Sequence, residues 1–530
     1  MSRIHDSSVG GSRPPSAVPP DTDFEPRRAW LTLAVAALGA MMVSLDGTVV
    51  LLAQPALQAD LGASLEQVQW VTTGYLLAVG SLLVISGGIG DRIGNRWAFL
   101  IGVTGFAVTS GLIAGVHDAG WLIGLRVLQG VSGAVLQPAT LGLLRETYPD
   151  DRLDMPIAIR SAAIAASTAA GPVVGGLLVE HVSWRAVFMM NVPLGLLTVL
   201  AGALLWRGRP ARHITRSSPR SFDFVGAAVL ATVLFALFFS VSKITSYGLL
   251  DLRSAGLVVL VLALTWVFTR IEKRVRDPLM PPALLRTPAL GVGFFLVITL
   301  SFAMIGTLFV LSYYVQNQLG LDPVAGGIHV LPLTGTLIVA AALSGFAMRR
   351  AGARVVVGAG LLVTAAATYG LSRLGPHAGS LELSLLLFAL GLGLAPALVG
   401  TTKIIVSSVP PELGGLAGGL HQTGMQIGSG IGIAVMGTML AGRAEVLVGA
   451  ELDRAGGPPV DPDVVSRAID EASVGLHRPV AGMPAELAAA WEQLSSSVFM
   501  DAMTYALGAA VVVALAGSLV AALGVRGKRT

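Results

Sequence analysis

Two ionisable side chains, Asp46 and Arg126, lie within long apolar stretches of this chain. On helices that cross a membrane, both would lie in the outer half of the bilayer, Asp46 about 24 Å beyond Trp30 and Arg126 about 7.5 Å beyond Trp121. An ionised carboxylate that faces lipid costs at least ~2.5 kcal/mol, so intramembrane acids usually serve proton or substrate pathways. We therefore expect Asp46 to take up and release a proton and Arg126 to modulate it. The alternatives are a structural carboxylate with another partner, and an arginine that reaches the interface or backbone carbonyls.

A second candidate is the glycine-rich turn GGIGDRIGNR, which begins at Gly87. Gly87 and Gly94 allow tight backbone geometry between two helices. Asp91 can accept hydrogen bonds from a helix N-terminus, which would form a charge-assisted latch. We interpret Gly87, Asp91, Arg92 and Gly94 as a cytoplasmic gate. The alternative is an ordinary turn whose charges are solvated.

A third candidate is the segment GPVVGG, which begins at Gly171 and ends at Gly176. Pro172 removes a helix hydrogen bond inside an apolar run. Gly171 and Gly175 form a GxxxG pair, which lets another helix approach closely. We expect the pair to pack against the opposite half of the protein and to seal the outer side against ion leak while the helix bends at Pro172.

Several polar and aromatic side chains could line a substrate cavity. The candidates are Trp70, Tyr75, Gln137, His421, Gln422 and Gln426. His421 lies close to both glutamines that follow it on a helix, although a histidine that only packs between helices fits equally well. We expect Lys403 to extend its amine to the cytoplasmic face. Whether Lys403 and His421 take part in coupling stays open at this stage.

The composition indicates a membrane protein that must hold these side chains on helices. Of the 530 residues, 54% are hydrophobic and 12% are charged, whereas soluble domains carry about 25% charged residues. The apolar runs of about 20 residues predict about fourteen transmembrane helices. A membrane β-barrel would instead show short alternating segments.

Chemistry other than transport finds little support in the sequence. The chain has no cysteine, which excludes disulfides and cysteine-ligated metals. It also lacks the Walker, HExxH and GxSxG motifs, so we predict that it is not an enzyme and needs no cofactor. If it transports, an ion gradient must supply the energy.

The loops give the orientation and the domains. Lys and Arg gather in alternate loops, which predicts that both termini are cytoplasmic. The turn at Gly87 recurs as GFAMRRAGAR at Gly345, which favours a duplicated six-helix unit. We therefore expect an all-α fold of two six-helix bundles with two inserted helices. The predicted parts are a disordered cytoplasmic tail (1–28), an N-terminal bundle (29–207), an inserted pair (221–271) and a C-terminal bundle (287–525), which includes an acidic extracellular loop (442–496).

These motifs together resemble the major facilitator superfamily, in particular its fourteen-span drug:proton antiporter branch. LDGTVVLLAQP from Leu45 is similar to the first-helix motif of that branch, and LIGLRVLQGVSGA from Leu122 to its fourth-helix motif. AAGPVVGG resembles the fifth-helix antiporter motif, and WRAVFMMNVPLG from Trp184 also fits. The chain departs from the first-helix motif at Leu51 and Gln54, and such positions bear on substrate choice.

The resemblance implies a proton-coupled efflux transporter in the plasma membrane that exports amphipathic, often cationic, small molecules by alternating access. Its partners would be the substrate, protons and the lipid bilayer, with no nucleic acid, and we expect a monomer. The alternatives are export of an endogenous metabolite or lipid, proton-coupled import, and a membrane sensor or scaffold. The GPVVGG segment argues against import, and the intramembrane ionisable residues argue against a scaffold.

Overall fold

The computed structural model describes most of the chain as helix. The described residues are 25–63, 65–149, 152–207, 223–247, 251–275, 287–321, 323–410, 413–455, 461–477, 479–483 and 485–524. Most of the expected tail, 1–28, lies outside them. Residues 26–28 do not belong to that tail, because α1 begins at Pro26, and a proline fits the first turn of a helix well.

Two groups of helices flank an inserted pair. The N-terminal half contains α1 (Pro26–Leu61), α2 (Leu65–Ile93), α3 (Asn95–Ala114), α4 (Ala119–Thr147), α5 (Asp154–His181), α6 (Trp184–Met189) and α7 (Asn191–Trp206). The inserted pair is α8 (Phe224–Tyr247) and α9 (Leu252–Glu272). The C-terminal half contains α11 (Pro288–Tyr313), η2 (Tyr314–Gln318), α12 (Pro323–Ser372), α13 (Ser380–Ser407), α14 (Gly414–Ala455), α15 (Pro462–Ser473) and α16 (Ala485–Gly524).

The helices agree with the predicted number of membrane spans. Within the described ranges, 11 helical segments are long and apolar enough to cross a membrane, and Val225–Ser240 of α8 is a shorter apolar helix. One of these segments, in α12, is two helices joined at Gly352, whose φ of 80° suits glycine alone. The 28 residues of α5 add a further helix of sufficient length. Together these helices make up the fourteen predicted spans.

The predicted extracellular loop 442–496 is mostly helical within the described residues. α14 continues to Ala455, α15 occupies Pro462–Ser473 and α16 begins at Ala485. α15 carries apolar side chains every fourth residue, at Val464 and Ala468, and these join Trp491 of α16 in a small buried cluster. The acidic residues excluded a membrane span here, but they did not exclude an amphipathic helix outside the membrane.

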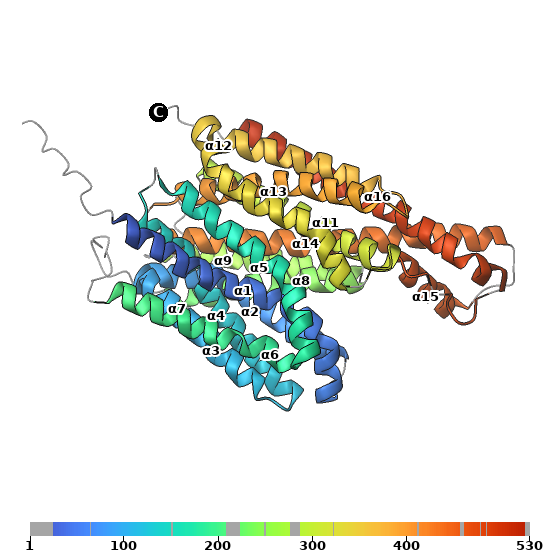
Figure 1. Cartoon of the computed structure of the whole chain (residues 1–530), viewed down its shortest axis with the longest axis horizontal. Helices are drawn as coiled ribbons and strands as arrows, with labels where there is room; N and C mark the ends of the chain where they lie inside the picture. Colours follow the sequence, from blue (N-terminus) through green and yellow to red (C-terminus); the bar gives the residue numbers. More distant parts are fainter. Residues whose placement is uncertain are drawn as a thin grey trace, which may run out of the picture.

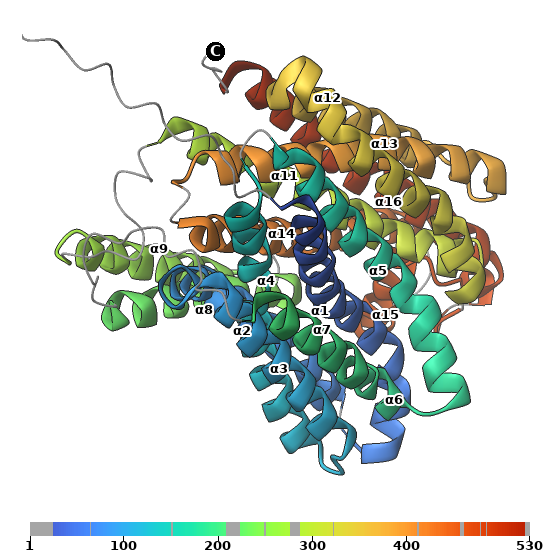
Figure 2. The same cartoon turned by 60° about the vertical axis from the view of Figure 1, so that its left-hand side comes forward.

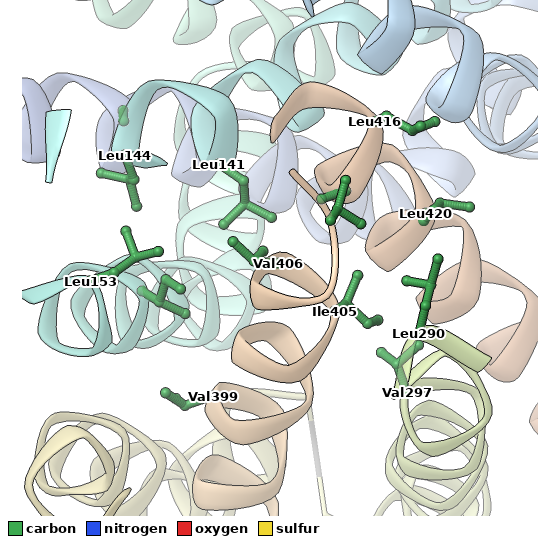
Figure 3. Close-up of a cluster of buried hydrophobic side chains, with 14 of the residues drawn as sticks. Leu141, Leu144, Leu153, Leu290, Val297, Val399, Ile405, Val406, Leu416 and Leu420 are labelled. Carbon is green, nitrogen blue, oxygen red and sulfur yellow. The ribbon is translucent and has the colours of Figure 1, made fainter. Parts of the chain in front are cut away.

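The two halves meet at one end of the molecule. Their helices lie together near the end that carries the C-terminus and diverge toward α6 and α15 (Figures 1 and 2). A buried apolar cluster joins the halves there, with Leu141 and Leu144 on α4 and Val406 on α13 (Figure 3). We call this the closed end, defined by the last turn of α2 and the first turn of α14. In the predicted orientation it faces the cytoplasm.

Candidate functional site

Asp46 on α1 and Arg126 on α4 form a buried ion pair. The Arg126 Nη1 atom donates to Asp46 Oδ2 at 2.7 Å, and the two side chains are only 1% and 0% exposed. Arg126 Nε also donates to the Val71 carbonyl of α2 at 3.2 Å. The ring of Tyr75 lies under the guanidinium, with 4.2 Å from its centroid to Arg126 Cζ. The side chains that we expected to face each other are therefore in direct contact.

Three residues that the sequence analysis did not single out complete this cluster. Gln129 Nε2 donates to Asp46 Oδ1 at 3.2 Å and to Ser110 Oγ at 2.7 Å. Asn191 Nδ2, at the start of α7, donates to the same Asp46 Oδ1 at 2.9 Å. Gln129 lies one turn after Arg126, and Asn191 lies within the quoted stretch WRAVFMMNVPLG, but neither side chain carries a charge that would have marked it. The carboxylate thus accepts hydrogen bonds from three side chains, an arrangement that suits its ionised form.

Asp91 links the two halves at the closed end. Its Oδ1 accepts from the backbone N of Gly415 at 2.6 Å, and its Oδ2 accepts from that of Leu416 at 2.9 Å. Both donors lie in the first turn of α14, where unpaired N–H groups attract a carboxylate. A Cβ atom on Gly87 would collide with the Gly415 carbonyl, so glycine is needed for this close approach of α2 and α14.

The other two residues of the expected gate, Arg92 and Gly94, lie at the end of α2 and in the turn that follows it. Arg92 Nη1 donates to the Gly88 carbonyl of its own helix at 3.1 Å. Gly94 joins α2 to α3 with a φ of 93°, which only glycine adopts readily. These residues shape the turn that holds Asp91 in place.

Two further contacts cross between the halves beside Asp91. Lys403 on α13 pairs with Asp154 at the start of α5, with 2.7 Å between Nζ and Oδ1. Our expectation for Lys403 was therefore incomplete, because its amine is held by an acid of the other half. Arg145 at the end of α4 donates to the carbonyls of Val406 and Val409. All of these contacts must break before the closed end can open.

The packing partner of the GPVVGG segment differs from our expectation. A Cβ on Gly171 would collide with the Thr48 side chain, and one on Gly175 would lie 3.0 Å from Val49 Cγ1. Both neighbours belong to α1, so the GxxxG pair packs within its own half and not against the opposite one. Gly176 has nothing within 4 Å of a Cβ position. Pro172 lies inside α5, which is helical throughout Asp154–His181.

The expected cavity residues fall into different surroundings. Tyr75 is buried in the Asp46 cluster, as described above. His421 is also buried, with 2.9 Å between its Nε2 and Thr402 Oγ1. Gln422 on α14 donates through Nε2 to Gln137 Oε1 on α4, which adds another contact between the halves. Two candidates, Trp70 and Gln426, are half-buried. Within the described ranges, no group of His, Asp or Glu side chains could hold a metal ion.

Two known proteins are similar in sequence to most of this chain. The Tetracenomycin C resistance and export protein of Streptomyces glaucescens is 43% identical over 93% of this chain and 91% of its own. The Puromycin resistance protein pur8 of Streptomyces alboniger is 33% identical over 79% of this chain and 83% of its own.

A solved structure with the same fold and a family profile also match this chain. The structure of the human organic anion transporter MFSD10 matches with a TM-score of 0.61 at 13% identity, over 93% of this chain and 99% of that one, which establishes a common fold alone. The profile of the Major Facilitator Superfamily matches residues 36–432. The chain therefore belongs to the Major Facilitator Superfamily.

Proposed function

We propose that this protein exports amphipathic small molecules, antibiotics among them, across the cell membrane in exchange for protons. Tetracenomycin C resistance and export are named for its relative from Streptomyces glaucescens, and puromycin resistance is named for its relative from Streptomyces alboniger. In this proposal the protein acts as a monomer, with both termini in the cytoplasm and the proton gradient as its energy source.

The buried Asp46–Arg126 pair is the observation that carries the proton-exchange part of the proposal. A carboxylate with 0% exposure inside a membrane helix is costly unless it is paired. Protonation of Asp46 would remove the charge that Arg126 and Asn191 hold. The contacts among α1, α4 and α7 would then weaken, so proton binding would bias the arrangement of the N-terminal half.

The contacts at the closed end would control access of the substrate from the cytoplasm, which is the other step that the transport cycle needs. In this structure Asp91 caps α14, and Lys403 pairs with Asp154. A substrate that enters from the cytoplasm requires these bonds to break, whereas a substrate that leaves outward requires them to form. Alternation between the two arrangements is the rocking of one bundle against the other.

Transport in inside-out vesicles tests this proposal. Tetracenomycin C and puromycin are the first probes, and a pH-sensitive dye reports protons inside the energised vesicles. We expect either drug to cause proton release from vesicles that contain the protein, and Asp46→Asn to abolish it.

The matched control is Asp60→Asn. Asp60 lies on the same helix and forms an equally short pair with Arg185, at 2.7 Å, but outside the buried cluster. This variant should retain proton release. Drug movement in the opposite direction would indicate an importer, and the absence of any response across a drug panel would contradict the proposal.

A further inference from the structure

A second buried arginine, Arg160 on α5, takes no part in the cycle described above. Its side chain is 2% exposed. Its Nε donates to Thr140 Oγ1 on α4 at 2.7 Å. Its Nη2 is buried without a hydrogen-bond partner in the part of the chain that the structure describes. An unsatisfied guanidinium nitrogen inside a membrane protein is costly, so this group calls for a ligand.

Two buried acids of the same half, Asp154 and Asp46, already have basic partners. Asp154, about 9 Å earlier along α5, pairs with Lys403. Asp46 pairs with Arg126. Among the described residues, no carboxylate oxygen lies within 4 Å of a nitrogen of Arg160. The described part of the chain therefore holds a buried guanidinium here that forms no ion pair with a described carboxylate.

Arg160 is joined through Thr140 to a network of hydrogen-bonding side chains. The Thr140 hydroxyl donates to the Gln137 carbonyl at 2.7 Å, and the Gln137 side chain accepts from Gln422. His421 extends this hydrogen-bonded network, with 3.2 Å between its Nδ1 and Gln422 Oε1. The Arg160 guanidinium thus lies at one end of a hydrogen-bonded network that reaches His421.

This network crosses the boundary between the two halves. Arg160, Thr140 and Gln137 belong to α4 and α5, whereas His421 and Gln422 belong to α14. Separation of the halves at the closed end would break the contact between Gln137 and Gln422 and uncover the guanidinium. Arg160 is about two helical turns inward from the Asp154–Lys403 pair, so it would face a molecule that enters from that end.

We propose that Arg160 binds an anionic oxygen of the exported molecule, a carboxylate or a phenolate, when the closed end opens. The proposal rests on the export function above and names its substrate class. A guanidinium can hold a carboxylate through parallel hydrogen bonds from two of its nitrogens, which favours acids over neutral or cationic compounds. The neutral amides and hydroxyls nearby can accept the remaining polar groups of such a molecule.

A matched pair of probes tests the charge preference. Anthraquinone-2-carboxylate and 2-(aminomethyl)anthraquinone share one ring system and carry opposite charges at pH 7. The purified wild-type protein should bind the acid at least tenfold more tightly than the amine, as followed by tryptophan fluorescence. In proteoliposomes, export of the acid should be correspondingly preferred.

Variants at one position connect this preference to Arg160. Arg160→Gln should lose at least tenfold in affinity for the acid and leave the affinity for the amine unchanged. Arg160→Lys should retain part of the preference, because lysine keeps the charge without the planar fork. The control Arg185→Gln removes an arginine that already pairs with Asp60 at 2.7 Å and should change neither affinity.

Each outcome decides between the claims. Equal wild-type affinity for the acid and the amine, or an unchanged preference in Arg160→Gln, overturns the assignment of Arg160. If Arg160→Gln does not fold, the wild-type comparison and Arg160→Lys still decide it. Proton-coupled export of other drugs with no preference for acids rejects this proposal alone. The loss of all drug-induced proton movement rejects the export function as well.

Discussion

The change Asp91→Ala tests whether the closed end is held by the cap that Asp91 places on α14. The substitution removes two hydrogen bonds, to Gly415 N at 2.6 Å and to Leu416 N at 2.9 Å. Loss of a helix cap costs about 0.5–2 kcal/mol, and a hydrogen bond to a charged group contributes about 1.5–3 kcal/mol. We therefore expect the closed arrangement to lose about 2–4 kcal/mol, which raises the ratio of open to closed protein roughly 30-fold to 700-fold.

The absence of cysteine from the chain provides a direct assay. Leu141 on α4 is 2% exposed and lies against α14 near Gly418. Leu141→Cys introduces one thiol that a maleimide can reach only when the halves separate. The labelling rate then reports the open population. Adding Asp91→Ala to this background should raise the labelling rate at least tenfold.

A matched control distinguishes the gate from a general effect of losing a cap. Asp118 also places a carboxylate on a helix N-terminus, with bonds to Gly120 N at 2.9 Å and Trp121 N at 3.0 Å, but both donors belong to its own half. Asp118→Ala should leave the labelling of Leu141→Cys unchanged. A labelling rate for Asp91→Ala within twofold of this control would refute the reasoning.

Two further predictions concern packing and acid stability. Gly171→Ala should sharply reduce the yield of folded protein in a fluorescence size-exclusion assay, because the added Cβ would collide with Thr48, whereas Gly176→Ala should behave as wild type because nothing lies within 4 Å. Hydrogen bonds, first from Arg185, lower the pKa of Asp60. The resulting stabilisation is present above about pH 4 and is lost as the pH falls below it. The melting temperatures of wild type and Asp60→Asn should thus differ at pH 6, and the difference should shrink as the pH falls below about 4. A difference that does not shrink would contradict this.

The fold and the main contacts could be predicted from the sequence because they depend on features with large free-energy costs. Apolar runs of membrane length must form helices, because the bilayer offers no other partner for backbone groups. An intramembrane carboxylate must find a partner, which led to the pairing of Asp46 with Arg126. Asp91 could be matched to a helix N-terminus, although the sequence did not identify α14 as that helix.

Other parts of the site depend on three-dimensional detail that a pattern does not carry. Gln129 and Asn191 are neutral, so their presence in a membrane helix gives no strong signal. The GxxxG pair at Gly171 identifies a surface for close packing but not its partner, which is α1 and not the opposite half. Arg160 lies between the predicted motifs. Only the structure shows that the buried acids Asp46 and Asp154 pair with other residues and leave Arg160 without an acidic partner among the described residues.

The most direct measurement of the central claim is uphill transport in proteoliposomes with an imposed proton gradient. The wild-type protein should accumulate tetracenomycin C or puromycin against its concentration gradient when protons flow the other way. Asp46→Asn should still bind the drug but should no longer accumulate it, because the buried carboxylate that pairs with Arg126 at 2.7 Å is gone. Undiminished proton-driven accumulation by Asp46→Asn would contradict the account.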